Sequence, residues 1–378
     1  MSKHKKYYKD DKYDVVRGWG WHLLSKNDSI FNDEHFMKEL QNTYYNNAVI
    51  GSSQQKHLDI VKNFGKIWKK LVPSNVEIPK NFYLTGSDAN NSLYDLALQI
   101  CQKKQPDYII RSAEIISMDK IWGGGRGKIA GLGFMDPDES LDEFRIPAPI
   151  TKKWNNNEED KKLDKKEYDA LNTIKKLVKK HDNIGGLLIE PIVGPYGVYF
   201  YRFDFMIKLR KICDKLKIPI ISDEILTGGG RTGKFFAYEH YPNFEPDYIT
   251  FGKGVLLAGL TRVNRKDYHR YPLPKTIVFG PTLYHYRDSL IRSTFVLTKI
   301  YDNELIKHAE KIGKYFIDKL RERAKLKKKN KIETNIRGMG LLIYVTDECC
   351  PYRIGTGMGR IMPELTITKE IIDYLTEK

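Results

Sequence analysis

Apolar residues recur at two different spacings along the chain, which predicts an alternation of helices and buried strands. The apolar positions between residues 58 and 71 fall at helical spacing, and so do those between residues 205 and 216. The segments GGLLIEPIV (185–193) and IPIISD (218–223) are instead near-continuous apolar runs of strand length. A buried strand, an amphipathic helix and a second buried strand in succession are typical of a parallel sheet. We therefore predict an α/β fold with a mainly parallel central sheet flanked by helices.

Further elements follow from the same two spacings. Charge dominates between residues 151 and 181, where a charged run precedes a helix expected over 168–180, and this stretch predicts an exposed insertion. The segments after residue 290 combine long helical patterns with one strand and predict a small α+β unit. Strands are expected at 81–84, 108–112, 114–118 and 341–345, and helices over 168–180, from 294 onward and over 367–377.

Composition places the chain among globular proteins. The sequence has 378 residues, of which 41% are hydrophobic and 30% charged, and this excludes a disordered tail. The 64 Lys and Arg residues exceed the 48 Asp and Glu residues by 16, which permits a polyanionic partner. No apolar run approaches the roughly 20 residues of a membrane span, and the first 14 residues lack the apolar core of a secretory signal. We therefore expect a cytoplasmic protein.

The four cysteines give no sign of a disulfide framework. They are Cys101, Cys213, Cys349 and Cys350. The only close pair is adjacent in sequence, where the backbone does not easily allow a disulfide of normal geometry. Small buried thiols in a reducing compartment are the expectation.

One glycine-rich segment imitates a nucleotide-binding loop. Residues 228–234, GGGRTGK, satisfy the G-x-x-x-x-G-K spacing, but Phe235 follows where a magnesium-binding hydroxyl is required. The segment GGGRGK at 123–128 begins one residue too late, because Trp122 occupies the position of the first glycine. Neither segment predicts a phosphate loop of that type.

Two polar residues stand out because each follows a strand-like run. Asp223 ends the apolar run IPIISD, and Lys253 lies between two glycines in ITFGKGV. Polar side chains at the carboxyl ends of parallel strands face the ligand crevice of an open α/β sheet. Taken one at a time, an Asp that caps a turn and a solvated loop lysine are the commoner interpretations.

Taken together, residues 223–253 resemble the active-site signature of class III aminotransferases, which are pyridoxal-phosphate (PLP) enzymes of fold type I. The segment contains Asp-Glu-Ile, Thr-Gly-Gly-Gly-Arg-Thr-Gly, Pro-Asp and Gly-Lys in the family's order. Four other segments are similar to further motifs of that family: TGSDANN (85–91), LLIEPIVGPYGV (187–198), IRGMGLL (336–342) and GRIMPELTITKEIIDYL (359–375).

The resemblance implies specific roles at the cofactor. Lys253 would form the Schiff base with PLP and then shuttle a proton at the substrate α-carbon. Asp223 would pair with the pyridine nitrogen, and Ile225 would press on one face of the ring. Gly86 and Ser87, at the start of a predicted helix, would bind the phosphate. Thr282 would reach the phosphate from the neighbouring subunit, which would make the active unit a homodimer.

The resemblance also implies a substrate side. Glu190 matches a glutamate that pairs with a substrate-binding arginine, and Arg360 matches an arginine that holds the substrate carboxylate. For both residues a purely structural role stays open. Leu226 stands where the family usually has Gln. The family's aromatic-His-Gly segment is Ile121-Trp122-Gly123 here, and Trp122 is a candidate for stacking on the cofactor ring.

The family implies three units and one leading activity. Residues 1–50 would form an N-terminal arm and part of a small domain, 51–290 the large PLP-binding domain, and 291–378 a shortened C-terminal small domain. The expected activity is transfer of an amino group from an amine or ω-amino acid to a 2-oxo acid. Another fold type I reaction stays open, namely an aminomutase, racemase or decarboxylase. An inactive PLP-fold protein and a basic polyanion-binding protein that uses the lysine-rich stretches 3–9 and 321–331 are the remaining alternatives.

Overall fold

The predicted α/β fold is confirmed by a computed structural model. It describes residues 23–24, 32–47, 54–133, 138–154, 163–195, 197–265, 285–326, 336–346 and 359–377. The helices are α1 (Glu34–Asn47), α2 (Gln54–Leu71), α3 (Gly86–Lys104), α4 (Lys128–Leu132), α5 (Lys165–Lys180), α6 (Phe203–Leu216), α7 (His285–Asp302), α8 (Leu305–Leu326) and α10 (Lys369–Thr376), with short 3-10 helices at Glu139–Phe144, Ala237–His240 and Lys253–Val255.

The strands build one large sheet and two small ones. They are β1 (Asn81–Tyr83), β2 (Glu114–Met118), β3 (Arg145–Ile146), β4 (Ile184–Ile189), β5 (Ile192–Val193), β6 (Tyr199–Phe200), β7 (Ile220–Glu224), β8 (Tyr248–Phe251), β9 (Ala258–Arg262), β10 (Ile336–Met339), β11 (Leu342–Val345) and β12 (Arg360–Ile361). The seven-stranded sheet has the order β1-β9-β8-β7-β4-β2-β3.

Five neighbouring strands of the large sheet, β3, β2, β4, β7 and β8, run parallel. Strand β9 pairs antiparallel with β8, and β1 pairs antiparallel with β9. Every residue of β4 and β7 is buried, which explains why their sequences are near-continuous apolar runs rather than alternating ones. Because β7 and β8 are parallel neighbours, their carboxyl ends lie at the same edge of the sheet.

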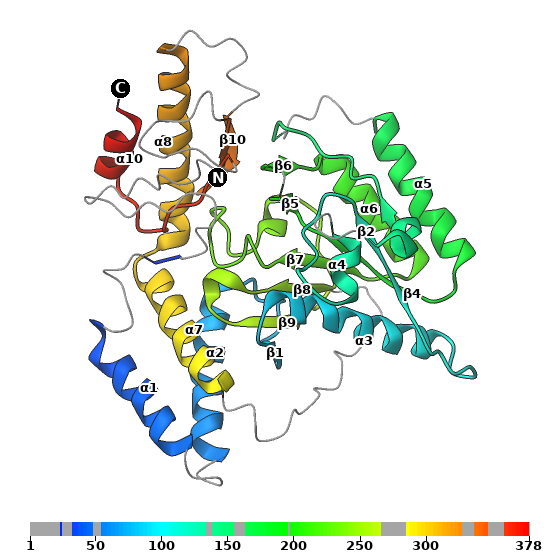
Figure 1. Ribbon diagram of the computed structural model, residues 1–378, viewed down its shortest axis with the longest axis horizontal. Coiled ribbons are helices and arrows are strands. Elements are labelled where there is room, and N and C mark those ends of the chain that lie inside the picture. The colour runs from blue at the N-terminus through cyan, green and yellow to red at the C-terminus, as the bar shows by residue number, and fades with distance from the viewer. Residues whose placement is uncertain are drawn as a thin grey trace, which may run out of the picture.

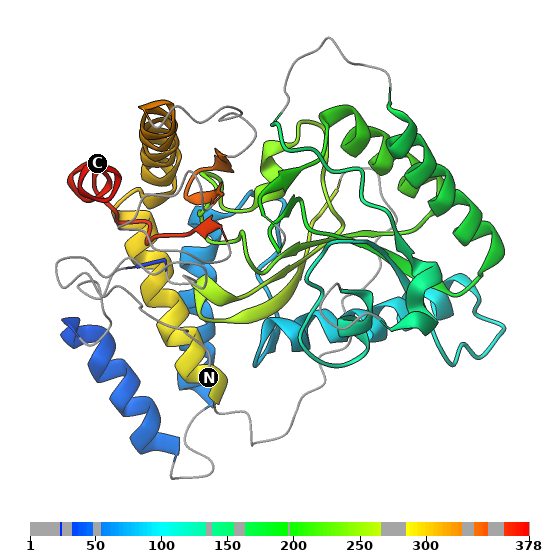
Figure 2. The ribbon, with the colours of Figure 1, turned by 45° about the horizontal axis from the view of Figure 1, so that its top comes forward.

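Helices cover both faces of this sheet. Helix α3 runs along one face, and α5 and α6 lie on the opposite face (Figures 1 and 2). Helix α2 packs against α7 beside the β1 edge. The buried indole of Trp68 on α2 contacts the rings of Phe235, Phe236 and Phe251, so this helix is fixed to the strand-bearing core.

A smaller unit lies beside the large sheet and is called the small domain here. It consists of α8, α10 and the antiparallel sheet β10-β11-β12, in which α8 contacts both α10 and β10 (Figure 1). A residue near the other end of the chain joins it, because the Leu365 N–H donates to the Leu23 carbonyl at 2.8 Å. The domain limits 50/51 and 290/291 stay predictions.

The expectation of a strand at residues 108–112 is wrong. Tyr108 and Ile109 are exposed, and the segment is an irregular connection between α3 and β2. A side chain of helix α3, rather than a neighbouring strand, makes hydrogen bonds with its backbone. The Gln102 amide donates to the Tyr108 carbonyl at 2.6 Å and its oxygen accepts from the Ile110 N–H at 3.0 Å. The short apolar run in residues 108–112 therefore led to a wrong strand prediction.

Two of the cysteines behave as predicted. Cys101 and Cys213 are free and buried, whereas Cys349 and Cys350 lie outside the described residues. Within the described ranges, every helix is too short or too polar to cross a membrane.

Candidate active site

Asp223 and Lys253 lie at the same edge of the large sheet. In the register of β7 and β8, Asp223 pairs with Thr250, and Lys253 follows the last residue of β8 by two positions. The Lys253 backbone has a φ of 45°, in the left-handed region that a β-carbon disfavours. Strained backbone of this kind concentrates at functional sites, where the surrounding structure fixes it.

The charges around Lys253 favour a reactive amine. Burial lowers the pKa of Lys253 and the Arg360 guanidinium acts in the same direction, while the carboxylates of Asp223 and Glu190 oppose them. A lowered pKa increases the fraction of neutral amine at neutral pH. Because the neutral amine is the form that attacks an aldehyde, the site suits a lysine that binds a carbonyl cofactor.

The Asp223 carboxylate is buried and held by donors on both oxygens. The Ile225 N–H donates to Oδ1 at 3.0 Å, and the Asn90 Nδ2 donates to Oδ2 at 2.7 Å. Burial raises the pKa of Asp223, whereas these two hydrogen bonds and the Lys253 ammonium lower it. The donors therefore offset part of the cost of keeping a charge in the interior.

Ile225 packs between Gly86, at the start of α3, and Gly252, which precedes Lys253. A β-carbon at Gly86 would lie 2.8 Å from Ile225 Cγ2, and one at Gly252 would lie 3.5 Å from the same atom. The Ile225 side chain thus packs between the start of α3 and the residue before Lys253. A larger residue at position 86 would force the Ile225 side chain to move.

The first turn of α3 leaves backbone N–H groups available at Gly86 and Ser87. Thr85 caps the helix, since its hydroxyl accepts from the Asp88 N–H at 3.2 Å and its own N–H donates to the Asp88 carboxylate at 3.0 Å. The start of this 19-residue helix lies beside Gly252, the residue before Lys253, and is a suitable phosphate site.

A glycine-rich loop, residues 122–127, is fastened along the first turns of α3. The Gly125 N–H donates to the Ser87 hydroxyl at 3.0 Å, and Asn90 Nδ2 donates to the Gly123 carbonyl at 2.6 Å. Arg126 forms an ion pair with Asp88 at 2.9 Å.

Asn91 holds the end of the same loop, because it donates to the Arg126 carbonyl at 2.9 Å. Gly127 has a φ of 73°, and a β-carbon there would lie 2.4 Å from the Asn91 side chain.

Asn90 was not singled out in the sequence as a functional residue. Its amide joins Asp223 to the glycine-rich loop, and its Oδ1 is buried without a hydrogen-bond partner among the described residues. A signal for it was present in the sequence. Asn90 lies four residues after Gly86, so on a helix it shares the face of the candidate phosphate-binding residue.

Glu190 and Arg360 lie within electrostatic reach of each other. Glu190 follows β4, and its carboxylate accepts from the Trp122 N–H at 2.6 Å and the Gly194 N–H at 3.2 Å. Burial and the Asp223 charge raise the pKa of Glu190 to about 8. Burial lowers the pKa of Arg360, on strand β12, and the Glu190 carboxylate opposes this. The small domain therefore delivers a guanidinium to the same pocket.

Three residues of the 223–253 signature serve the fold. The buried Glu224 carboxylate accepts from the Ala237 and Tyr238 N–H groups at 2.8 and 2.9 Å. Arg231, which is 2% exposed, donates to the Pro363 carbonyl at 2.8 Å and so ties the loop after β7 to the small domain. Asp247 pairs with Arg210 at 2.7 Å and with Arg265 at 3.0 Å. They position the edge that carries Asp223 and Lys253.

Leu226 makes an apolar contact where a Gln was expected from the family pattern. It packs against a buried cluster that includes Val198 from the large domain and Leu342 and Met362 from the small domain. A β-carbon at Gly194 would lie 2.2 Å from Leu226 Cδ2. This side chain therefore contributes to the contact between the domains.

The remaining two sequence-predicted residues are less defined. The Trp122 backbone reaches Glu190, and the stacking of its ring on a cofactor stays a prediction. Thr282 lies outside the described residues.

The residues present fit PLP. One edge of the sheet gathers a lysine with a lowered pKa, a hydrogen-bonded buried carboxylate and the start of a long helix, and these match the aldehyde, ring nitrogen and phosphate of that cofactor. The tight packing of Ile225 against Gly86 supplies an apolar wall between the two polar ends.

The fold and this edge define an α/β enzyme scaffold of the PLP-dependent transferase type. A model of the family described as aminotransferase class-III matches residues 37–378, so the chain belongs to the class III aminotransferases. Members of this family depend on PLP, and the cofactor predicted from the sequence is confirmed.

Curated relatives carry several activities. An acetylornithine aminotransferase of Aquifex aeolicus is 32% identical over 223 residues, which cover 54% of this chain and 56% of that protein. An alanine/serine racemase of Pyrococcus horikoshii is 28% identical over 221 residues, which cover 52% and 45%. The chain thus spans about half the length of these relatives.

Among solved structures, a lysine aminotransferase from M. tuberculosis is similar in fold. The two share 18% sequence identity with a TM-score of 0.68, and the alignment covers 94% of this chain and 86% of the other.

Proposed function

We propose that the protein is a PLP-dependent aminotransferase that transfers an amino group from an amine or ω-amino acid to a 2-oxo acid. The observation that carries the proposal is the arrangement of Lys253, Asp223 and the start of α3 at one sheet edge within a class III family chain. When bound, PLP supplies an electron-accepting ring that stabilises negative charge on the substrate carbon next to the amine.

The residues of this chain have separate tasks in that reaction. The Lys253 amine would hold the cofactor through its aldehyde and, once released, would move a proton at the substrate α-carbon. The lowered pKa of Lys253 favours the neutral amine, which is the form that can accept that proton. Asp223 would pair with the ring nitrogen and favour its protonated form, and Asn90 and Ile225 fix the carboxylate in place for that role. The N–H groups of Gly86 and Ser87 bind the phosphate.

Arg360 orients the substrate by binding the carboxylate of the substrate. A guanidinium offers a planar pair of donors that suits a carboxylate, and the Glu190 carboxyl group lies within electrostatic reach of it. The amino-group donor and the 2-oxo acid would then use one pocket in turn, which predicts ping-pong kinetics.

The first test combines a spectrum with product stoichiometry. Purified protein is expected to show a visible cofactor band that an amine donor removes and a 2-oxo acid restores. One keto product should form per amino group transferred. Absence of a cofactor band in wild-type protein supplied with PLP would contradict the proposal.

Racemisation is the second candidate, and the similarity to the Pyrococcus racemase favours it. A racemase would invert the α-carbon of an amino acid without needing a 2-oxo acid and without releasing a keto product. Chiral chromatography of alanine and serine after incubation with the holoenzyme separates the two proposals.

We also propose a homodimer with shared sites, in which Thr282 of each chain serves its neighbour. The support is the family resemblance at Thr282. Mixed refolding of Lys253→Ala and Thr282→Ala chains should restore activity at a PLP concentration where neither parent is active, because each mixed dimer holds one intact site. Two inactive parents that never complement would contradict sharing. The cytoplasmic location stays a prediction.

A further inference from the structure

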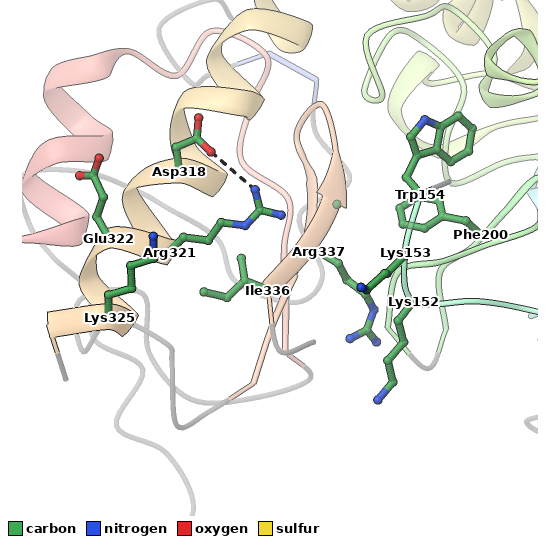
Figure 3. Close-up of a pocket in the computed structure, with 11 residues that line it drawn as sticks. Lys152, Lys153, Trp154, Phe200, Asp318, Arg321, Glu322, Lys325, Ile336 and Arg337 are labelled. Carbon is green, nitrogen blue, oxygen red and sulfur yellow. Dashed lines mark ion pairs between the residues drawn. The ribbon is translucent and has the colours of Figure 1, made fainter. Parts of the chain in front are cut away.

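A basic groove of about 700 Å³ lies between the two domains. One wall is formed by α8 and β10 of the small domain, and the other by Lys152, Lys153 and Trp154, which precede α5, together with Phe200 of β6 (Figure 3). This volume falls in the range of small-molecule sites. The groove is called the interdomain groove below.

Cationic side chains outnumber acidic ones along this groove. The cations are Lys152, Lys153, Arg321, Lys325 and Arg337, and the two acids are Asp318 and Glu322. Both acids already have cationic neighbours, since Asp318 lies 3.6 Å from Arg321 and Glu322 lies 3.8 Å from Lys319.

The three lysines of the groove carry the excess charge. Within the described part of the chain, Lys152, Lys153 and Lys325 form no ion pair, and all three are exposed. Like charges that share a concave space repel one another and raise the local concentration of anions. The excess therefore favours an occupant with more than one negative charge.

Arg337 supplies a rigid cation at the groove. Its guanidinium carbon lies 4.4 Å from the centre of the Tyr199 ring and 4.0 Å from that of Tyr344, and its Nε donates to the Val198 carbonyl at 2.6 Å. Arg337 is 5% exposed. A charge fixed in this way does not swing away from a ligand, so little ordering entropy is lost on binding.

The groove is next to the candidate substrate pocket but separate from it. Arg337 pairs with Tyr344 across β10 and β11, and Tyr344 pairs with Arg360 across β11 and β12. Two antiparallel pairings of about 5 Å each put the Cα atoms of Arg337 and Arg360 roughly 10 Å apart. Tyr344, on the middle strand β11, therefore lies between Arg337 and Arg360.

From this geometry we propose that the interdomain groove binds a small polyanion that carries at least two phosphate or carboxylate groups. The ligand bridges the lysines of the large domain with Lys325 and Arg337 of the small domain. This site is additional to the PLP and substrate sites, and its occupancy does not require the proposed aminotransferase activity.

The test is calorimetric titration of the holoenzyme with tripolyphosphate and, in a parallel arm, with citrate. The cofactor is first fixed by borohydride reduction so that its phosphate site stays occupied. We expect saturable binding of one polyanion per chain at about 0.15 M salt, where diffuse attraction to the net charge of +16 is largely screened. The tighter of the two probes identifies the ligand as a polyphosphate or a polycarboxylate.

Matched variants locate the binding. The triple variant Lys152→Ala, Lys153→Ala and Lys325→Ala should bind about tenfold more weakly or worse. The charge-matched variant Lys176→Ala, Lys179→Ala and Lys211→Ala, on the exposed faces of α5 and α6, should stay within about twofold of wild type, as should Arg360→Ala. All substituted lysines are exposed, so folding is preserved.

Three results would overturn the site. One is the absence of saturable binding by either probe. Another is an equal loss of affinity in the two triple variants, which would indicate diffuse attraction. The third is loss of binding in Arg360→Ala, which would assign the polyanion to the substrate pocket.

Discussion

The cofactor side and the substrate side of the candidate site are built in different ways. The cofactor side, with Asp223 and Lys253, rests on two buried neighbouring strands of a seven-stranded sheet. The substrate side, with Arg360, rests on the two-residue strand β12 at the edge of a three-stranded sheet. Both strand ends are buried, but the first lies on longer strands inside a large sheet and the second on a two-residue strand at the edge of a small one. The proposed cofactor contacts are thereby separated from a proposed substrate contact on a short segment.

Breaking the cofactor side should produce the largest effect. Asp223→Asn removes the carboxylate that holds a proton on the ring nitrogen, and we expect kcat to fall by about 10²- to 10³-fold, as for other lost preorganised electrostatic contacts. Steady-state kinetics at saturating PLP measure the change. The matched control is Asp119→Asn, because Asp119 follows a parallel strand of the same sheet and its carboxylate accepts the Ala148 N–H in a loop contact. Equal activity of the two variants would contradict the role of Asp223.

Breaking the substrate side should change binding rather than chemistry. Arg360→Ala removes one charged donor group, which corresponds to about 1.5–3 kcal/mol, or roughly 10- to 100-fold in the KM of a 2-oxo acid. The dissociation constant of PLP should change much less than the KM, because Arg360 is the smallest of the influences on the Lys253 pKa. Partial recovery of KM in Arg360→Lys would support a charge contact. A loss of PLP affinity in Arg360→Ala would show that the two sides are not separate.

A pair of neighbouring asparagines sharpens the comparison within the cofactor side. Asn90 and Asn91 both hold the glycine-rich loop, but only Asn90 donates to Asp223. Asn90→Ala should lose about 1–3 kcal/mol in the free energy of unfolding, because two buried acceptors lose a donor. Asn91→Ala should lose less, because the Arg126 carbonyl that it serves is exposed. Only Asn90→Ala should also weaken PLP binding, by about tenfold. Thermal unfolding and PLP titration measure the two quantities, and identical PLP affinities would refute the positioning role of Asn90.

The smallest expected effect is a pH shift. The Glu190 carboxylate stabilises the Lys253 ammonium and so raises the pKa of Lys253. Glu190→Gln removes the charge that Glu190 carries above its pKa of about 8, so in that range the Lys253 pKa should fall and the amine should be neutral at lower pH. The rate at which apoenzyme captures PLP should therefore reach its half-maximum at a lower pH than in wild type. Glu114→Gln, at a surface ion pair with Lys128, should leave the profile in place. A shift to higher pH in Glu190→Gln would contradict this sign.

Much of the fold could be predicted from local pattern. The continuous apolar runs of β4 and β7 correspond to fully buried parallel strands, and the spacing from Asp223 to Lys253 matched two neighbouring strand ends. The strand expected at residues 108–112 was wrong because its backbone groups are satisfied by Gln102, a contact that no periodicity reveals.

The contacts that organise the site were harder to predict because they join distant segments. The bond from Asn90 to Asp223 spans 133 residues, and that from Trp122 to Glu190 spans 68. The Asp-Glu pair at 223–224 illustrates a second difficulty. Adjacent strand residues face opposite sides, so Asp223 serves the cofactor edge while Glu224 holds the segment near Tyr238. The sequence placed both in one motif without separating these roles.

The most direct test of the account is to find which lysine carries the cofactor. Holoenzyme is reduced with borohydride, digested and analysed by mass spectrometry for a pyridoxyl-phosphate adduct. The account predicts one adduct per chain, on the peptide that contains Lys253, and none in Lys253→Ala protein treated in the same way. An adduct on a different lysine in wild-type protein, or an unchanged amount of adduct in Lys253→Ala, would contradict it.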